Sequence, residues 1–143
     1  AKRYLKGTGC VEYHIYHRNC GPDGDPKYEQ AVNDINQADD KHSARLTRKR
    51  ETENYLHPRV VREAFTLEVD FGDFDDVPRI VSDASKTTAL APDMGEGTAK
   101  RLLNTKAASM MTGDDLREVD PDEEVLSWFR EISQLVSDIR NGA

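Results

Sequence analysis

The sequence contains no long hydrophobic run. None of its apolar stretches approaches the ~20 residues that a helix needs to cross a bilayer, and the N-terminal AKRYLKGTG has no apolar segment of the kind found in signal peptides. Hydrophobic residues make up 36% and charged residues 33% of the 143 positions. Because the apolar residues come in periodic blocks, the composition indicates a folded domain. We therefore expect a highly charged cytoplasmic protein with no membrane partner.

The sequence also lacks a general excess of positive charge. Its formal net charge is −7, which excludes the broad basic surface that grips nucleic acid without regard to sequence. Arg45, Arg48, Lys49 and Arg50 nevertheless form a dense basic cluster, whereas acidic residues concentrate at 70–76 and 114–124. If DNA binds, we expect it near 45–50, with Arg45, Arg48 and Arg50 as the contacting residues.

Cysteine is scarce as well. Cys10 and Cys20 are the two cysteines, and they bracket VEYHIYHRN with its two histidines, which resembles a zinc-ligand pattern. The intervening residues alternate like a strand, however, and an extended segment rises ~3.3 Å per residue. The two sulfurs would then lie ~30 Å apart, too far to share one ion. We expect reduced, non-catalytic cysteines and no zinc.

The first half of the chain predicts a βαβ unit. A strand at 10–18 is followed by the loop NCGPDGDP, by a helix through 27–38 with Pro26 in its first turn, and by a second strand at 42–47. A unit of this length implies parallel strands. Ligands of such sheets bind at the carboxyl ends of the strands, which here are 17–25 and 48–53.

Further elements follow along the chain. The sequence predicts a helix opened by Pro58, a third strand at 66–71, a helix whose buried face holds Val77, Ile80, Val81 and Ala84, and a helix within 99–111. We expect at least one of the four aspartates in 70–76 to cap a helix. The predicted organisation is an α/β core at 1–85 and a helical C-terminal extension at 86–143 packed on that core.

The last helix has the clearest pattern. Asp120 suits an N-cap, Pro121 the first helical position, Glu123 a capping box and Gly142 the position past the end. An apolar stripe runs along this helix, consisting of Val125, Phe129, Ile132, Val136 and Ile139. The first interpretation is a helix packed on its own domain. The second is a homodimer seam, because steps of four and three also suit a short coiled coil.

One segment resembles a known family. The run LTRKRETENYLHP, residues 46–58, is similar to the hallmark segment in the C-terminal Toprim region of OLD-family (overcoming lysogenization defect) nucleases, where a basic residue and paired glutamates precede Asn-Tyr-Leu. EYHIYHRN lies where that family has the strand ending in its Asp-x-Asp motif, and PKYEQAVNDIN is similar to the following helix. The resemblance continues through FGDFDDVPRIV, AKRLLNTKAASMMT and DPDEEVLSWFREI, and covers most of the chain from about residue 11.

The resemblance implies a fold and an activity. The fold would be a partial Toprim, a Rossmann-like parallel sheet flanked by helices. The activity would be cleavage of nucleic-acid phosphodiesters with Mg²⁺ or Mn²⁺, since carboxylates hold such metals and the metals activate water and stabilise the leaving oxygen. Lys49 matches the family's essential basic position, and Glu51 and Glu53 match its paired glutamates. In that family the Toprim region follows an ABC-type ATPase.

The chain departs from the family at the metal site. Where the Asp-x-Asp motif would lie, the sequence reads His17-Arg18-Asn19, so both carboxylates are missing. Asn19 remains as a weak oxygen ligand, and Asp23 and Asp25 in the following loop are candidate substitutes. The family's first acidic residue would precede residue 1, and the chain contains no Gly-rich phosphate loop for ATP.

Two hypotheses follow. In the first, the chain is a fragment or subunit of an OLD-like nuclease, and a missing N-terminal portion or a partner chain supplies the acids. In the second, it is a catalytically inactive Toprim remnant that serves as a binding or assembly module. Retention of Lys49, Glu51 and Glu53 favours the first, whereas loss of the Asp-x-Asp acids favours the second.

Overall fold

The computed structural model of the chain describes residues 10–38, 42–89 and 91–141. They form two compact units: unit 1 holds the residues up to 48 and those from 122 onward, and unit 2 holds residues 49–121. The prediction placed its boundary near 85, whereas the units divide after 48 and after 121. Over the described residues the architecture is α/β, with a two-stranded parallel sheet and six α-helices. No helix among these residues combines the length and apolar character needed to cross a bilayer.

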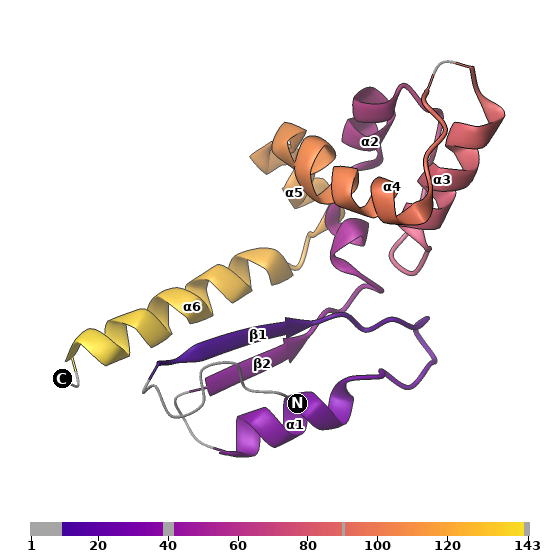
Figure 1. Cartoon of the computed structure of the whole chain (residues 1–143). Helices are drawn as coiled ribbons and strands as arrows, with labels where there is room; N and C mark the ends of the chain where they lie inside the picture. Colours follow the sequence, from indigo (N-terminus) through magenta and orange to yellow (C-terminus); the bar gives the residue numbers. More distant parts are fainter. Residues whose placement is uncertain (1–9, 39–41, 90, 142–143) are drawn as a thin grey trace. The chain divides into compact units, whose positions relative to one another are not determined.

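Unit 1 contains the predicted strand, helix and strand. Strand β1 (Glu12–Tyr16) pairs with β2 (His42–Leu46) in parallel, with Glu12 opposite His42 and Tyr16 opposite Leu46. Helix α1 (Glu29–Ala38) connects the two strands (Figure 1). The parallel pairing expected from the spacing of these elements is therefore confirmed.

Helix α1 covers one face of this sheet. Its Val32 and Ile35 are buried with Ala44 of β2, and Tyr16 and Leu46 pack against the same cluster. The Asn36 side chain accepts a hydrogen bond from the Ala44 N–H at 2.8 Å and donates one to the Ala44 carbonyl at 3.0 Å. This amide thus takes the place of a third strand beside β2 and blocks the sheet edge at Ala44.

Helix α6 (Glu124–Asn141) covers the opposite face of the sheet (Figure 1). The Tyr13 hydroxyl donates to Glu131 Oε2 at 2.7 Å, and Arg45 Nε lies 3.0 Å from the same oxygen. Burial and the Glu131 hydrogen bond raise the pKa of Tyr13 well above its usual range. Trp128 is the buried residue of α6.

Unit 2 is helical. After a 3₁₀ turn at Thr52–Tyr55, it contains α2 (Pro58–Phe65), α3 (Val77–Thr87), α4 (Glu96–Leu102), a π-helical turn (Leu103–Ala107), a 3₁₀ turn (Ala108–Met110) and α5 (Gly113–Val119). The predicted helices at 58, 77 and 99–111 are all present. Asp76 caps α3 by accepting a hydrogen bond from the Arg79 N–H, as expected for one of the four aspartates.

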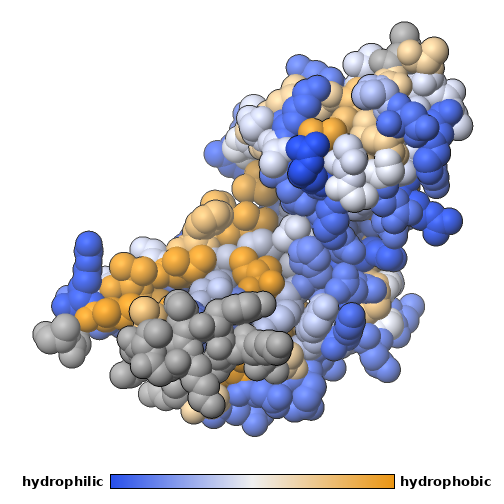
Figure 2. Space-filling view, viewed as in Figure 1, coloured by the Kyte–Doolittle hydropathy of each residue, from blue (hydrophilic) through white to orange (hydrophobic). Residues whose placement is uncertain are grey.

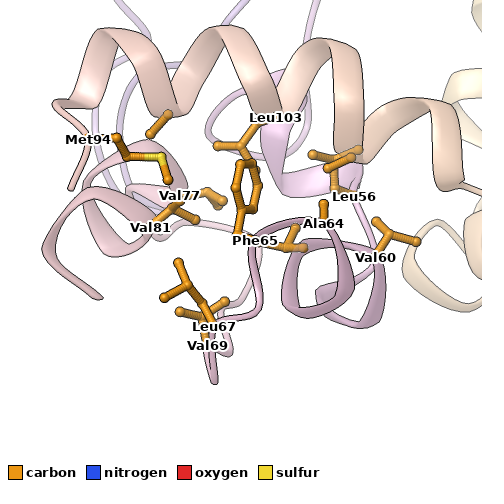
Figure 3. Packing of buried hydrophobic residues seen from close by; sticks show 13 residues of the cluster. Leu56, Val60, Ala64, Phe65, Leu67, Val69, Val77, Val81, Met94 and Leu103 are labelled. Carbon is orange, nitrogen blue, oxygen red and sulfur yellow. The ribbon is translucent and has the colours of Figure 1, made fainter. Parts of the chain in front are cut away.

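The core of unit 2 is built from the inward faces of α2, α3 and α4 (Figure 3). Its buried residues include Val60, Ala64 and Phe65 of α2, Val77 and Val81 of α3, and Ala99, Leu103 and Ala107 from α4 and the π-helical turn. Figure 3 shows the Phe65 ring between Leu103 and the residues of α2 and α3. Of the four α3 residues predicted to be buried, Val77 and Val81 are, whereas Ile80 and Ala84 lie partly buried at the edge of the core.

The predicted strand at 66–71 is wrong. The alternation is real, since Leu67 and Val69 are buried while Thr66, Glu68 and Asp70 are exposed. The segment packs on the helices of unit 2, however, and pairs with no other strand of the described residues. Period-two alternation marks an extended segment with one buried face, and such a segment is a strand only if a neighbour completes its hydrogen bonds.

The predicted start of the last helix is also wrong. The Asp120 N–H bonds to the Leu116 carbonyl at 2.8 Å, so Asp120 ends α5 and does not begin α6. Glu123 has a φ of 57°, a left-handed conformation that cannot lie within a right-handed helix, and its carbonyl accepts a hydrogen bond from the Ser127 N–H at 2.9 Å as the residue that precedes the helix. Helix α6 therefore begins at Glu124. The predicted terminator Gly142 lies outside the described residues.

The predicted apolar stripe of this helix is largely solvent-exposed. Phe129 is 64% exposed, and Val136 and Ile139 are each 48% exposed. The buried Trp128 and Glu131, which contacts Tyr13 of the sheet, lie about a quarter-turn or more away from Phe129 around the helix. The other two residues of the predicted stripe, Val125 and Ile132, are partly buried, so the stripe faces the unit only in part. Figure 2 shows hydrophobic residues gathered along this helix.

An ion pair joins α2 to α5. Arg59 Nε and Nη2 contact the two carboxylate oxygens of Asp115 at 3.1 and 2.6 Å. Asp115 also accepts hydrogen bonds from the Thr112 N–H and hydroxyl at 2.8 and 2.7 Å, which form the cap of α5. The Arg59 guanidinium and the Thr112 hydrogen bonds hold the pKa of Asp115 well below its usual range.

Asp115→Asn should make the free energy of unfolding depend less on pH in the acid range. Because the folded-state pKa of Asp115 lies below its unfolded value of about 3.9, its contribution is present above that value and is lost as the pH falls through the folded pKa. Urea unfolding from pH 5 to pH 2 would measure the difference. Asp114→Asn is the matched control, since that neighbouring carboxylate is exposed. An unchanged acid slope in Asp115→Asn would contradict the assignment.

Candidate functional site

The segment Lys49–Tyr55 is fixed in unit 2 by a buried amide. Asn54 Nδ2 donates to the carbonyls of Gly72 and Asp75 at 2.8 and 3.0 Å, and its Oδ1 accepts from the Glu51 N–H at 3.0 Å. One side chain therefore closes the 3₁₀ turn at Glu51 and attaches it to the loop that precedes α3. This is the local reason why Glu51 and Glu53 have defined positions.

The side chain of Lys49 points into unit 2 and is only 4% exposed. Its Nζ lies 2.7 Å from Asp73 Oδ1 and donates to the carbonyls of Val119 at 2.6 Å and Asn54 at 3.1 Å. The ammonium also lies 5.1 Å from the centre of the Tyr55 ring. An ammonium has three N–H donors, and these three oxygens occupy all of them. Binding a phosphate would require Lys49 to give up one of these contacts.

The aspartates of 70–76 serve the same segment. The Arg50 N–H donates to the Asp73 carbonyl at 2.9 Å, and Arg50 Nη2 lies 3.2 Å from Asp76 Oδ2. Asp75 Oδ2 accepts from the Gly72 N–H at 2.8 Å, which tightens the loop. These acids therefore hold Lys49, Arg50 and their own loop in place.

Glu53 is a carboxylate with 0% exposure. Its Oε1 accepts a hydrogen bond from Asn104 Nδ2 at 2.6 Å, and its Oε2 accepts a longer one from the Thr52 hydroxyl at 3.4 Å. A carboxylate without water around it requires such donors and a nearby positive charge. The positive charge comes from Lys100.

Lys100 lies between the two glutamates. Its Nζ is 2.6 Å from Glu51 Oε2 and 3.6 Å from Glu53 Oε1. Burial alone would lower the pKa of Lys100, but the Glu51 hydrogen bond and the charges of both glutamates outweigh it, and the pKa is raised. Glu51, Glu53, Lys100 and Asn104 are called the glutamate cluster below. Its centre is a point where two carboxylates converge on one cation.

The helical part of the glutamate cluster is anchored by the core. Lys100 and Asn104 are one turn apart, and Asn104 Nδ2 also donates to the Lys100 carbonyl at 3.0 Å. Leu103 and Ala107, in the same π-helical turn as Asn104, are completely buried. Such π-helical turns within α-helices often occur at functional sites. The apolar side chains thus fix the direction in which Lys100 and Asn104 point.

Sequence reasoning identified Glu51 and Glu53 but missed Lys100 and Asn104. The only local signal is their spacing of four residues on a helix, which is common and carries no information about distant carboxylates. The helix itself was predicted.

The remaining metal candidates belong to unit 1. Asn19, Asp23 and Asp25 are exposed on the loop between β1 and α1, and Asn19 has a φ of 60°, which asparagine tolerates. A turn closed by the Gly24 N–H and the Gly21 carbonyl at 3.2 Å shapes this loop.

The predicted DNA-contacting arginines are each paired with acids of their own unit. Arg45 pairs with Glu131, and Arg48 pairs with Asp122 and Glu124, all in unit 1. Arg50 pairs with Asp76 in unit 2. A phosphate that approaches any of the three would compete with a carboxylate already in place, which weakens the attraction.

The glutamate cluster has the chemistry of a cation site. Carboxylate oxygens are the protein ligands that Mg²⁺ and Mn²⁺ prefer, and Mg²⁺ is commonly held by one or two of them while it keeps several waters. Glu51 and Glu53 supply two carboxylates, and Asn104 orients one of them. Counted with Lys100, the two glutamates leave a formal charge of −1. The donor set therefore fits a hard divalent cation that displaces the ammonium.

Comparison of the chain with family models, with curated proteins and with solved structures finds no significant match. The resemblance to the OLD family stays a prediction from the residues that carry it.

Lys49→Met should destabilise unit 2 by about 2–4 kcal/mol, because it leaves the oxygens of Asp73, Asn54 and Val119 without their shared buried donor. Denaturant unfolding would measure the loss. Lys86→Met is the control: its ammonium is exposed and pairs only at the surface of α3, so a change below about 0.5 kcal/mol is expected. Equal midpoints for the two variants would exclude a supporting role for Lys49.

Proposed function

We propose that this chain is a divalent-cation-binding module related to the OLD-family nucleases. In this proposal the glutamate cluster contributes ligands to a centre that cleaves nucleic-acid phosphodiesters. The observation that carries it is the convergence of Glu51 and Glu53 on a single ammonium, at 2.6 and 3.6 Å. These are the two glutamates that the family resemblance assigns to the metal site.

The roles of the residues follow from their surroundings. Glu51 and Glu53 would hold Mg²⁺ or Mn²⁺, and Asn104 keeps the Glu53 carboxylate in one orientation. When bound, such a metal activates water and stabilises the leaving oxygen of a phosphodiester. Lys100 is 41% exposed on its side chain, so it is the cation of this cluster that a phosphate can reach. The buried Lys49 holds the segment Lys49–Tyr55 in place through its ion pair with Asp73.

The proposed centre is incomplete within the glutamate cluster. Two carboxylates leave most positions of an octahedral metal to water or to other ligands, and the Asp-x-Asp acids of the family are replaced by His17-Arg18-Asn19. We therefore place the missing carboxylates outside this chain, in an N-terminal Toprim portion or in a partner that also carries the ABC-type ATPase.

Metal binding is the first test. Calorimetric titration with Mn²⁺ should give a binding isotherm for the wild-type chain. Glu51→Gln should abolish it by removing one of two carboxylates. Lys100→Met should tighten it about five- to tenfold, because the competing ammonium is gone.

Glu68→Gln is the matched control for this titration, since Glu68 is an exposed carboxylate of unit 2 outside the glutamate cluster. It should leave Mn²⁺ binding unchanged. Identical isotherms for the wild type and Glu51→Gln would exclude the glutamate cluster as the binding site.

A second candidate function is a non-catalytic binding or assembly module. It is favoured by the Lys49 ammonium, whose three donors are all used inside unit 2, so that the family's essential cation is committed to the fold. Nicking of supercoiled plasmid with Mn²⁺ separates the two functions. Nicking that Glu51→Gln abolishes supports the nuclease. Mn²⁺ binding without nicking supports the non-catalytic module, provided that nicking is still absent when the N-terminal Toprim portion or the partner with the ABC-type ATPase is added.

A further inference from the structure

The middle of the extended segment 66–71 in unit 2 has unpaired main-chain groups. At one end, the Leu67 N–H donates to the Arg62 carbonyl at 3.2 Å, and at the other, the Phe71 N–H donates to Asp70 Oδ1 at 3.0 Å. Between them, the N–H and carbonyl groups of residues 68–70 have no hydrogen-bond partner among the residues that the structure describes. The segment thus has the alternation of a strand without the hydrogen bonds of a strand.

The unpaired groups are arranged as one strand presents them to another. In an extended chain the main-chain groups of successive residues point to opposite edges. The Leu67 N–H points to α2, so the N–H and carbonyl groups of Glu68 and Asp70 point to the other edge. Both of these residues are exposed, whereas Leu67 and Val69 pack on the core of the unit. Glu68 and Asp70 therefore offer the alternating donors and acceptors to which an antiparallel strand can bind.

A hollow of about 590 Å³ adjoins the same segment. Its charges balance, because two arginines and two glutamates line it together with apolar and hydroxyl side chains. The lining comes from the start of the segment, from α2 and from the end of α3, and consists of Thr66, Leu67, Glu68, Arg59, Arg62, Glu63, Ala84, Thr87 and Thr88. Paired strands lie ~4.8 Å apart, so an added strand needs space beside the segment. The hollow supplies such space, and a side chain of the added strand can enter it.

The side chains of Glu68 and Asp70 determine which strand can be added. Two copies of the segment, paired antiparallel through these positions, would bring Glu68 opposite Asp70 or each acid opposite itself. Like charges directly opposite one another destabilise a strand pair, whereas opposite charges stabilise it. This edge therefore disfavours a second copy of itself and favours a strand with basic side chains at the two facing positions.

We propose that the segment 66–71 binds an extended basic segment of a partner protein as an added antiparallel strand. Lysine or arginine side chains of the partner lie opposite Glu68 and Asp70, and the residues between them are apolar and point toward the helices of unit 2. In this mode of recognition main-chain hydrogen bonds supply the affinity, and side chains at alternate positions supply the specificity. The segment and the hollow share no residue with the glutamate cluster, so the proposal does not depend on the metal-binding function.

Fluorescence anisotropy with the labelled peptide Lys-Val-Lys-Val-Lys tests the proposal, in about 0.15 M salt so that long-range attraction is screened. The wild-type chain should bind this peptide saturably. It should bind Glu-Val-Glu-Val-Glu at least about tenfold more weakly, because two cross-strand charge pairs change from attraction to repulsion. Absence of saturable binding of the lysine peptide up to about 1 mM would overturn the proposal.

A charge-reversed double variant locates the site. Glu68→Lys with Asp70→Lys should reverse the preference, so that the glutamate peptide binds more tightly than the lysine peptide. The matched control is Asp93→Lys with Glu96→Lys, which changes the net charge equally at two exposed acids outside the segment and the hollow. This control should keep the preference of the wild type. Equal loss of lysine-peptide binding in the two double variants would overturn the assignment to this segment.

Methylation of the peptide main chain separates strand pairing from attraction by charge, and it uses the wild-type chain, so that no variant has to fold. N-methyl groups on the lysines remove the N–H donors that face Glu68 and Asp70, and should weaken binding at least about tenfold. N-methyl groups on the valines, whose N–H groups face the other edge, should leave the affinity within about twofold. Equal affinities of the two methylated peptides would overturn the strand pairing.

Discussion

Charge removed from water must be matched by charge and hydrogen bonds nearby, and this constraint organises unit 2. The segment Lys49–Tyr55 buries an ammonium, a carboxylate and an amide within a few residues. Lys49 is matched by Asp73 and two carbonyls, and Glu53 by Asn104 and Lys100. Those partners come from the loop before α3, from α4 with its π-helical turn, and from the end of α5. The polar side chains of this one short segment thus contact three separate parts of unit 2.

This constraint separates two kinds of charged residue that look alike in sequence. Lys49 and Arg50 are adjacent, yet Lys49 is inside the unit while Arg50 is paired near the surface with Asp76. The exposed pairs contribute little to the free energy of folding. Removing one partner of the buried set leaves an uncompensated group and costs much more. The density of charge in RKRETEN therefore reflects internal structure at two positions, Lys49 and Glu53, as well as a solvated surface.

The sequence predicted those elements whose signal is local. The βαβ pattern at 10–47, the helix opened by Pro58 and the Asp76 cap depend on neighbouring residues, and the structure contains them. Three features could not be read from the local pattern. The segment 66–71 has no strand partner in the described residues, Glu123 has a left-handed backbone so that the last helix begins only after it, and Lys100 meets Glu51 across 49 residues of sequence. In each case a tertiary contact or a single backbone angle decided the outcome.

The glutamate cluster also raises the question of why a buried residue such as Glu53 is charged. Replacing a buried ion pair with apolar residues of similar volume often leaves stability unchanged or improves it, so stability alone is a weak reason for Glu53 to be acidic. One ammonium serves two carboxylates here, and it lies 1.0 Å closer to Glu51 than to Glu53. A divalent cation would carry a charge equal to that of both glutamates together. Under the proposed function a 2+ ion would therefore balance the charge that Lys100 balances only in part, and the Asn104 hydrogen bond would orient the Glu53 carboxylate toward it.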